Sequence, residues 1–173
     1  AIAPIGLMLE MHKYMKKNGI EYEFVNDDFG VREIDLNDFD DWLIDFEKNS
    51  KDKIRDRDYQ YTSLKNCLNL NRCILESPTG SGKTRIIYTY LAWILEHDFT
   101  ENDKILLVVP STNLVQQTHD DFVDYGMNKD IICKIYTGQE KNFNKTIIIS
   151  TWESLQFKEI EFFEQFTVLV VDE

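Results

Sequence analysis

Residues 77–84 read Ser-Pro-Thr-Gly-Ser-Gly-Lys-Thr, a combination of residue types that can bind phosphate. Gly80 and Gly82 allow the backbone to curl so that its N–H groups point inward at phosphate oxygens. A helix that starts here adds partial positive charge at its N-terminus. Lys83 would then meet the β- and γ-phosphates of a nucleotide, and the Thr84 hydroxyl would hold Mg²⁺.

The segments beside this phosphate loop have the pattern that such a loop requires. The apolar run Cys73–Leu75 predicts a short buried strand, and apolar residues at helical spacing follow from Ile86 to Ile94. Strand, glycine-rich turn and helix in this order are typical of nucleotide-binding proteins. The common pattern begins with Gly where this chain has Ser77, so a chance glycine-rich turn is the alternative. The flanking pattern favours the nucleotide site.

Two carboxylates follow the apolar run 166–171, which predicts another buried strand. Asp172 would hold Mg²⁺ through water, and Glu173 would orient and deprotonate the water that attacks the γ-phosphate. An ordinary polar strand end is the alternative, but a phosphate loop already requires a metal partner. The predicted catalytic residues are therefore Lys83, Asp172 and Glu173, and the predicted metal ligands are Thr84 and Asp172.

A third set of candidate residues opens a predicted helix ahead of the loop. The Gln60 amide donates and accepts hydrogen bonds at once and can read the edge of an adenine, while Tyr59 offers a ring surface. A capped surface helix is the alternative. The predicted ATP-binding residues are Arg57, Tyr59, Gln60, Thr79, Gly80, Ser81, Gly82, Lys83 and Thr84.

Further strands are predicted at 104–110, 131–136 and 146–150, and polar residues follow two of them. Carboxyl ends of parallel strands share one edge of a sheet, where hydroxyls and free N–H groups of a helix cap can contact a nucleic-acid phosphate. Plain helix capping is the alternative. The predicted nucleic-acid-binding residues are Pro110, Ser111, Thr112, Asn113, Thr151 and Trp152.

Composition limits the class of protein. The 173 residues are 43% hydrophobic, which is enough to bury a core. The net charge of -12 argues against whole-surface attraction to nucleic acid or an anionic membrane, but local hydroxyls and N–H groups still bind phosphate. The three cysteines form no CxxC pair and the histidines have no ligand spacing to them, so we expect reduced thiols and no zinc. No apolar run is long enough to span a membrane.

Residues 1–50 are predicted to be a separate small piece. They contain a helical pattern, a half-buried strand at 20–25 and a second helix at 38–46 with an acidic outer face. The charged stretch 49–57 is poor in apolar residues and predicts a linker. We therefore expect a nucleotide-binding domain over 51–173.

As a set, these motifs resemble those of the first motor domain of a superfamily 2 helicase. The resemblance covers roughly residues 54–173 and implies an α/β fold of RecA-like type, a parallel P-loop sheet flanked by helices. The matching segments are 57–60 for the adenine-reading motif, 77–84 for motif I, 110–112 for motif Ia, 150–152 for motif Ic and 170–173 for the start of motif II.

Within that superfamily the chain looks similar to the UvsW helicases of tailed phages. Val108–Pro110, Asp121–Tyr125 and Thr151–Trp152 match in order and spacing. The resemblance implies ATP- and Mg²⁺-dependent unwinding or remodelling of branched DNA and RNA–DNA hybrids in recombination and replication, in the cytoplasm of the infected cell. It also implies that residues 1–50 are the later part of a small α/β substrate-binding domain.

The sequence stops within motif II, where the family continues with a strand between the phosphate-loop strand and the Asp172 strand, and with a second RecA-like domain. We expect the sheet of residues 1–173 to have a gap or an unpaired edge. We also expect this segment alone to bind nucleotide weakly and not to unwind DNA. The alternatives are a motor subunit of a restriction or antiviral nucleic-acid-sensing system and a non-hydrolysing, nucleotide-gated nucleic-acid-binding module.

Overall fold

The computed structural model describes residues 8–21, 34–50, 56–70, 72–136 and 144–172. The chain forms two compact units, residues 1–31 and 32–173. The smaller unit contains helix α1 (Met8–Lys17), which confirms the first predicted helix. Gly19 ends it with a φ of 62°, a left-handed conformation that favours glycine. The strand predicted at 20–25 lies mostly outside the described residues.

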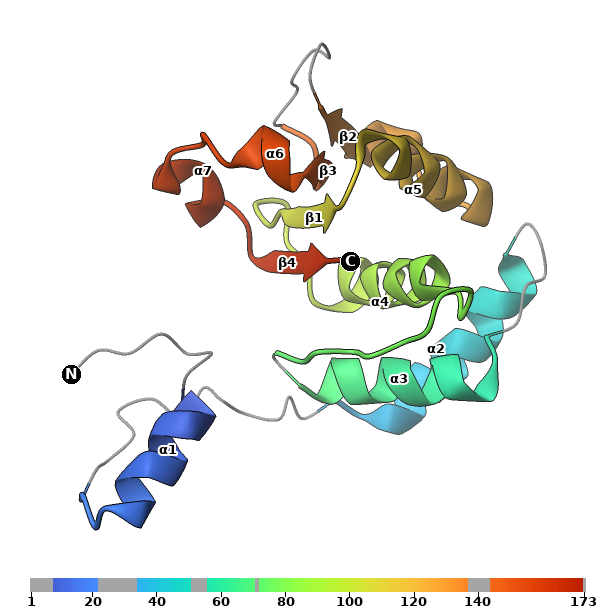
Figure 1. Cartoon of the computed structure of the whole chain (residues 1–173). Helices are drawn as coiled ribbons and strands as arrows, with labels where there is room; N and C mark the ends of the chain where they lie inside the picture. Colours follow the sequence, from blue (N-terminus) through green and yellow to red (C-terminus); the bar gives the residue numbers. More distant parts are fainter. Residues whose placement is uncertain (1–7, 22–33, 51–55, 71, 137–143, 173) are drawn as a thin grey trace. The chain divides into compact units, whose positions relative to one another are not determined.

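The larger unit has the α/β fold with a parallel sheet that the sequence predicted (Figure 1). Its four described strands lie in the order β2-β3-β1-β4. Helix α5 lies between β1 and β2 in the chain, and α6 and α7 lie between β3 and β4, which suits parallel strands because each must return to the same end of the sheet. The elements in chain order are α2 (Leu36–Asn49), α3 (Asp58–Asn69), α4 (Lys83–His97), β1 (Ile105–Val109), α5 (Thr112–Tyr125), a 3₁₀ turn (Lys129–Ile131), β2 (Ile132–Ile135), β3 (Ile147–Thr151), α6 (Trp152–Leu155), α7 (Ile160–Glu164) and β4 (Val168–Val171).

The two faces of the sheet belong to two hydrophobic cores, because successive side chains of a strand point in opposite directions. Leu107 of β1 packs with residues of α2, α3, α4 and α5 in the larger core. Leu106 packs on the other face with Leu155 of α6 and with Phe162 and Phe166 at α7. Both faces are thus covered, which explains why β1 is buried along its whole length. None of the described helices is long and apolar enough to cross a membrane.

Helix α2 packs in the larger unit. Phe39 is fully buried and meets the Trp93 ring of α4 edge-on, with centroids 5.2 Å apart. The Asp40 carboxylate accepts hydrogen bonds from Tyr61 Oη at 2.6 Å and Lys65 Nζ at 2.8 Å, both on α3. The compact units therefore divide before α2, whereas the sequence placed a domain boundary near residue 50. The aromatic face of α2 was visible in the sequence, but the surface that it covers was not.

The segment Cys73–Leu75 is not the buried strand that the sequence predicted. It has no strand geometry, and the side chain of Ile74 is 94% exposed. A strand needs a neighbour for its backbone N–H and C=O groups, and no described strand pairs with this segment.

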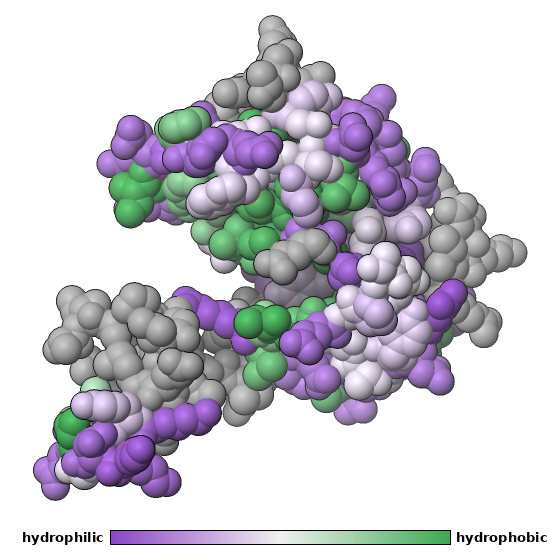
Figure 2. Space-filling view, in the orientation of Figure 1, coloured by the Kyte–Doolittle hydropathy of each residue, from purple (hydrophilic) through white to green (hydrophobic). Residues whose placement is uncertain are grey.

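Strand β4 is an edge of the described sheet, which confirms the predicted unpaired edge. It pairs with β1 on one side only, and its alternate residues Leu169 and Val171 are 64% and 59% exposed. Hydrophobic surface is visible at the position of β4 in Figure 2. The apolar run before the phosphate loop and the apolar face of β4 are therefore both left uncovered by the described residues.

Candidate nucleotide-binding site

The phosphate loop has the backbone geometry that its glycines predict. Gly80 and Gly82 have φ values of 79° and 80°, in the left-handed region. The helix predicted after the loop is α4, which begins at Lys83 with Gly82 as its N-cap. A Cβ at Gly82 would lie 2.5 Å from Nε2 of Gln60, whereas a Cβ at Gly80 would meet nothing within 4 Å. Gly82 is thus favoured by its conformation, and a side chain there would also displace the end of the Gln60 side chain.

The charge of the loop lysine acts on the carboxylate that follows β4, Asp172. Lys83 Nζ donates to the carbonyl oxygen of Ser77 at 3.2 Å, which folds the lysine back over its own loop. The backbone N–H of Asp172 donates to the carbonyl of Val108 at 2.9 Å and continues the β1–β4 pairing. Burial raises the pKa of Asp172 above its usual range, and the nearby Lys83 charge offsets part of this.

A magnesium ion would find hard oxygen donors here. The Thr84 hydroxyl is in the first turn of α4, and the Asp172 carboxylate follows β4. Mg²⁺ in nucleotide sites is held by one or two protein oxygens together with phosphates and water, so this small donor set fits. Among the described residues, no three His, Cys, Asp or Glu side chains form a metal-binding group of their own. The predicted base, Glu173, lies outside the described residues.

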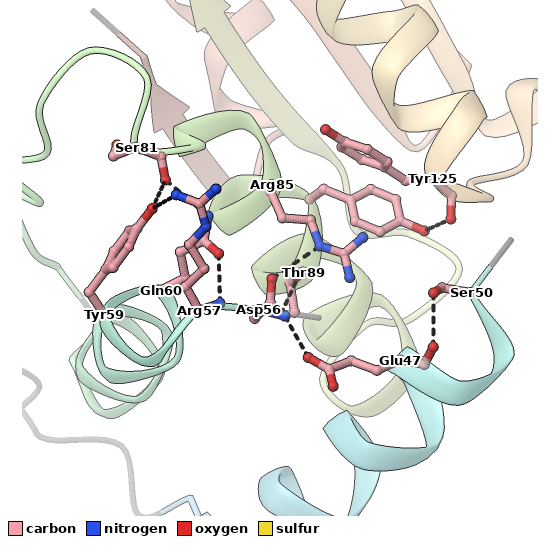
Figure 3. A network of polar contacts seen from close by, with 11 residues as sticks. Glu47, Ser50, Asp56, Arg57, Tyr59, Gln60, Ser81, Arg85, Thr89 and Tyr125 are labelled. Carbon is pink, nitrogen blue, oxygen red and sulfur yellow. Dashed lines mark hydrogen bonds and ion pairs between the residues drawn. The ribbon is translucent and has the colours of Figure 1, made fainter. Parts of the chain in front are cut away.

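The adenine-motif residues contact the phosphate loop directly (Figure 3). Gln60 Nε2 and Tyr59 Oη donate to the carbonyl of Ser81 at 3.0 and 2.8 Å. Gln60 Oε1 accepts from the backbone N–H of Arg57 at 2.8 Å, and the side chain is 6% exposed. Arg57 Nη1 donates to Tyr59 Oη at 3.2 Å. These residues therefore hold the loop in the present structure, a contact that the spacing did not predict.

The nucleic-acid candidates divide into exposed and buried groups. The register pairs Val109 of β1 with Thr151 of β3, so the segments after both strands lie side by side. Ser111 caps α5, its Oγ accepting from the N–H of Leu114 at 3.4 Å. Pro110, Thr112 and Asn113 are exposed, and Trp152 is 67% exposed.

Thr151 differs from the other candidates because it is fully buried. Its Oγ1 accepts from the N–H of Ser154 at 3.3 Å and caps α6. In this conformation Thr151 has no surface to offer a ligand, and its hydroxyl is engaged in capping.

Four polar residues beside the site were missed in the sequence: Glu47, Asp56, Arg85 and Thr89. Arg85 Nε and the Asp56 carboxylate form an ion pair at 3.1 Å, with side chains 5% and 1% exposed. One signal was available, because an arginine two residues after the loop lysine is followed directly by the apolar stretch of the helix. Nothing in the sequence identified its partner.

The parallel sheet, the phosphate loop at the start of α4 and the carboxylate after β4 define a nucleotide-binding domain of the RecA-like α/β class. A family model described as "Type III restriction enzyme, res subunit" matches residues 53–173. The chain belongs to this family of superfamily 2 helicase domains.

Individual relatives agree with that assignment. The ATP-dependent DNA helicase uvsW of Enterobacteria phage T4 is 31% identical over 178 residues, which cover 99% of this chain and 35% of that protein. The DNA 3'-5' translocase XPB2 of Sulfurisphaera tokodaii is 31% identical over 123 residues, covering 71% of this chain and 26% of that protein. A crystal structure of the UvsW helicase from bacteriophage T4 matches 98% of this chain and 61% of that one, with a TM-score of 0.86 and 29% identity.

The matches span a part of each relative. The chain is similar to about a third of the uvsW protein and a quarter of XPB2. It therefore resembles part of an ATP-dependent DNA helicase or translocase.

Proposed function

We propose that this chain is the nucleotide-binding part of an ATP-dependent DNA helicase or translocase that unwinds or remodels branched DNA and RNA–DNA hybrids. The observation that supports the proposal most directly is the left-handed backbone of Gly80 and Gly82 just before Lys83, the first residue of α4, because this geometry is typical of a phosphate-binding loop. The similarity to a DNA helicase, uvsW, and to a DNA translocase, XPB2, supports the DNA motor. Recombination and replication in the cytoplasm of an infected cell are the setting that the UvsW resemblance suggests.

In this proposal the phosphate loop binds the nucleotide through its backbone. The N–H groups at the start of α4 receive the phosphate oxygens, and Lys83 leaves the Ser77 carbonyl to contact the β- and γ-phosphates. Thr84 and Asp172 hold Mg²⁺, which neutralises charge on the phosphates when it is bound. Glu173 accepts a proton from the attacking water.

The DNA backbone would lie along the carboxyl ends of β1 and β3. Thr112, Asn113 and Trp152 are the candidates with exposed surface there. Contacts to phosphate and sugar carry no base information, so binding would be independent of sequence. Thr151 would act by capping α6, which positions Trp152.

Two parts of the proposal concern the whole protein. A second RecA-like domain would supply the arginine that acts on the γ-phosphate, an effect of about 10³–10⁵ in rate. Residues 1–50 would belong to a substrate-binding domain, although α2 also packs in the motor unit. Residues 1–173 alone would therefore bind nucleotide weakly and not unwind DNA.

The test is steady-state ATP hydrolysis by the full-length protein, with and without branched DNA, beside a Glu173→Gln variant. We expect DNA to stimulate hydrolysis and the substitution to abolish it, because the amide cannot accept the proton from water. Hydrolysis that is indifferent to every nucleic acid would contradict the proposed DNA motor. Nucleotide binding without hydrolysis in the unchanged protein would favour the nucleotide-gated module.

A further inference from the structure

The two oxygens of the Asp56 carboxylate are bound by one helix, α4. Oδ1 accepts from Arg85 Nε at 3.1 Å, and Oδ2 accepts from Thr89 Oγ1 at 3.3 Å. Thr89 is fully buried, and the ion-pair side chains are 1% and 5% exposed. Asp56 directly precedes the adenine-motif segment, residues 57–60. The helix that begins at the phosphate loop therefore fixes the start of that segment.

Aromatic rings enclose the other side of the arginine. The guanidinium carbon of Arg85 lies 5.7 Å from the ring centroid of Phe46, 5.4 Å from that of Tyr88 and 5.3 Å from that of Tyr125. A cation over a ring face is attracted to the negative face of the ring, more strongly where water is excluded. These rings come from α2, α4 and α5, so the Arg85 side chain has little freedom to move away from Asp56.

The adenine-motif segment is attached to the phosphate-loop side at its other end as well. Tyr59 Oη and Gln60 Nε2 both donate to the Ser81 carbonyl. Helix α2 adds a contact at the first end, because Glu47 Oε1 accepts from the Asp56 backbone N–H at 2.6 Å. Figure 3 shows the sequence of contacts from Glu47 through Asp56 to α4, and from Gln60 to Ser81.

Stability alone does not account for this buried ion pair. Taking two charges out of water costs about as much as their attraction returns, and apolar residues of similar volume often stabilise a protein more. The pair does, however, fix the distance between Asp56 and helix α4, because separating the partners would leave an unpaired buried charge. A geometric role is the better explanation.

We propose that Asp56 and Arg85 are positioning residues that hold the adenine-motif segment at a set distance from the phosphate loop, so that base and phosphates of one nucleotide are recognised together. This inference rests on the proposed nucleotide site. In this proposal Arg85 does not contact the nucleotide but connects the two halves of its site, the adenine-motif segment and the phosphate loop. Through its hydrogen bond to Asp56, Glu47 also attaches this segment to α2.

The test compares ligands that use one half of the site or both. Binding constants for Mg-ATP, Mg-GTP and inorganic triphosphate are measured on the full-length protein and on Asp56→Asn. We expect ATP affinity to fall about tenfold and the preference for ATP over GTP to shrink towards one, while triphosphate binding stays unchanged. Asp40→Asn is the matched control, since it removes the same charge from an ion pair between α2 and α3. We expect it to change neither the ATP affinity nor the preference for ATP over GTP.

Thr89→Val keeps the experiment decisive if Asp56→Asn does not fold. It removes one hydrogen bond to Asp56 with almost no change in volume. We expect the ATP preference to fall about two- to threefold, again with unchanged triphosphate binding.

Several results would overturn the inference. Variants that retain the full ATP preference would show that Asp56 does not position the segment. Equal losses for ATP and triphosphate would indicate damage to the loop itself. Equal binding of ATP and GTP by the unchanged protein would remove the adenine role but leave the nucleotide site intact. Failure of the unchanged protein to bind any of the three ligands would contradict the proposed function itself.

Discussion

The phosphate loop separates two apolar segments that have different fates in this structure. Helix α4 follows the loop, and its Leu91 and Ile94 are 0% and 1% exposed. Cys73–Leu75 precedes the loop, and Ile74 is 94% exposed. A helix satisfies its backbone hydrogen bonds internally, whereas a strand depends on a neighbour. The comparison shows that the loop conformation here rests on α4 and on the adenine-motif segment, without a strand in front of it.

The largest expected effect is the loss of stability caused by a cavity beneath helix α4, which follows the loop. Leu91→Ala should lower the free energy of unfolding by about 2–5 kcal/mol, because the fully buried side chain leaves a cavity in the larger core. Urea denaturation followed by tryptophan fluorescence measures it.

The matched control is Ile74→Ala, in the segment before the loop. We expect a change within about 0.5 kcal/mol, because the side chain is almost fully exposed. A loss at Ile74 as large as that at Leu91 would mean that the preceding segment is buried in solution and that the two flanks are equivalent.

The next effect concerns the contact between the loop and the adenine-motif segment. Gly82→Ala should destabilise the fold by more than the roughly 1–2 kcal/mol that a left-handed alanine costs, because its Cβ would also displace Gln60 Nε2. Gly80→Ala has the same backbone conformation but open space, and should cost only the conformational part.

Thermal unfolding of the two glycine variants separates these contributions. If Gly82→Ala and Gly80→Ala lose the same amount of stability, the close approach of Gln60 to Gly82 is contradicted. Greater loss at Gly82, with weakened ATP binding, would support the role of Gln60 in holding the loop.

A smaller effect is expected at Asp172, and it depends on pH. Burial raises the pKa of Asp172, so its ionised form is disfavoured in the folded state. Stability contributed by the protonated form is present at low pH and is lost as pH rises through the raised pKa. Asp172→Asn should therefore be the more stable protein at neutral pH, by an amount that disappears on acidification, and should lose Mg²⁺-dependent ATP binding.

Unfolding curves of both proteins between acidic and neutral pH check this sign. A variant that is less stable than the parent at neutral pH would mean that the Lys83 charge outweighs burial. Unchanged Mg²⁺-dependent ATP binding by Asp172→Asn would remove this carboxylate from the metal site.

The sequence predicted the parts of the fold whose signals are local. Helix α4 begins at Lys83 because Gly82 and the apolar spacing after it are sufficient, and α5 begins after Ser111 because a serine caps it. The strands of the sheet were readable as apolar runs, and β1 and β3 are buried along their whole length, whereas β4 is partly exposed. Cys73–Leu75 has the same composition, but composition does not reveal whether a partner strand is present.

The candidate site was predictable where one motif carries one role. The motifs identified Lys83 and Asp172, and in the structure the pKa of Asp172 is raised by burial and partly lowered again by the Lys83 charge, but the roles of Lys83, Asp172 and Glu173 remain predictions. The sequence missed the Asp56–Arg85 pair because the partners are distant in the chain and neither belongs to a recognised pattern. Thr151 was predicted to bind nucleic acid; in this structure it is fully buried and its Oγ1 caps α6, which the sequence did not reveal.

The most direct measurement is equilibrium binding of Mg-ATP to the full-length protein and to Lys83→Ala, by calorimetry. We predict binding by the unchanged protein and a loss of at least about tenfold in the variant, because an ammonium–phosphate contact is a charge-assisted hydrogen bond. Thermal unfolding of the variant checks that it is folded. Equal affinity in the two proteins would contradict the assignment of residues 77–84 as the site where the nucleotide phosphates bind.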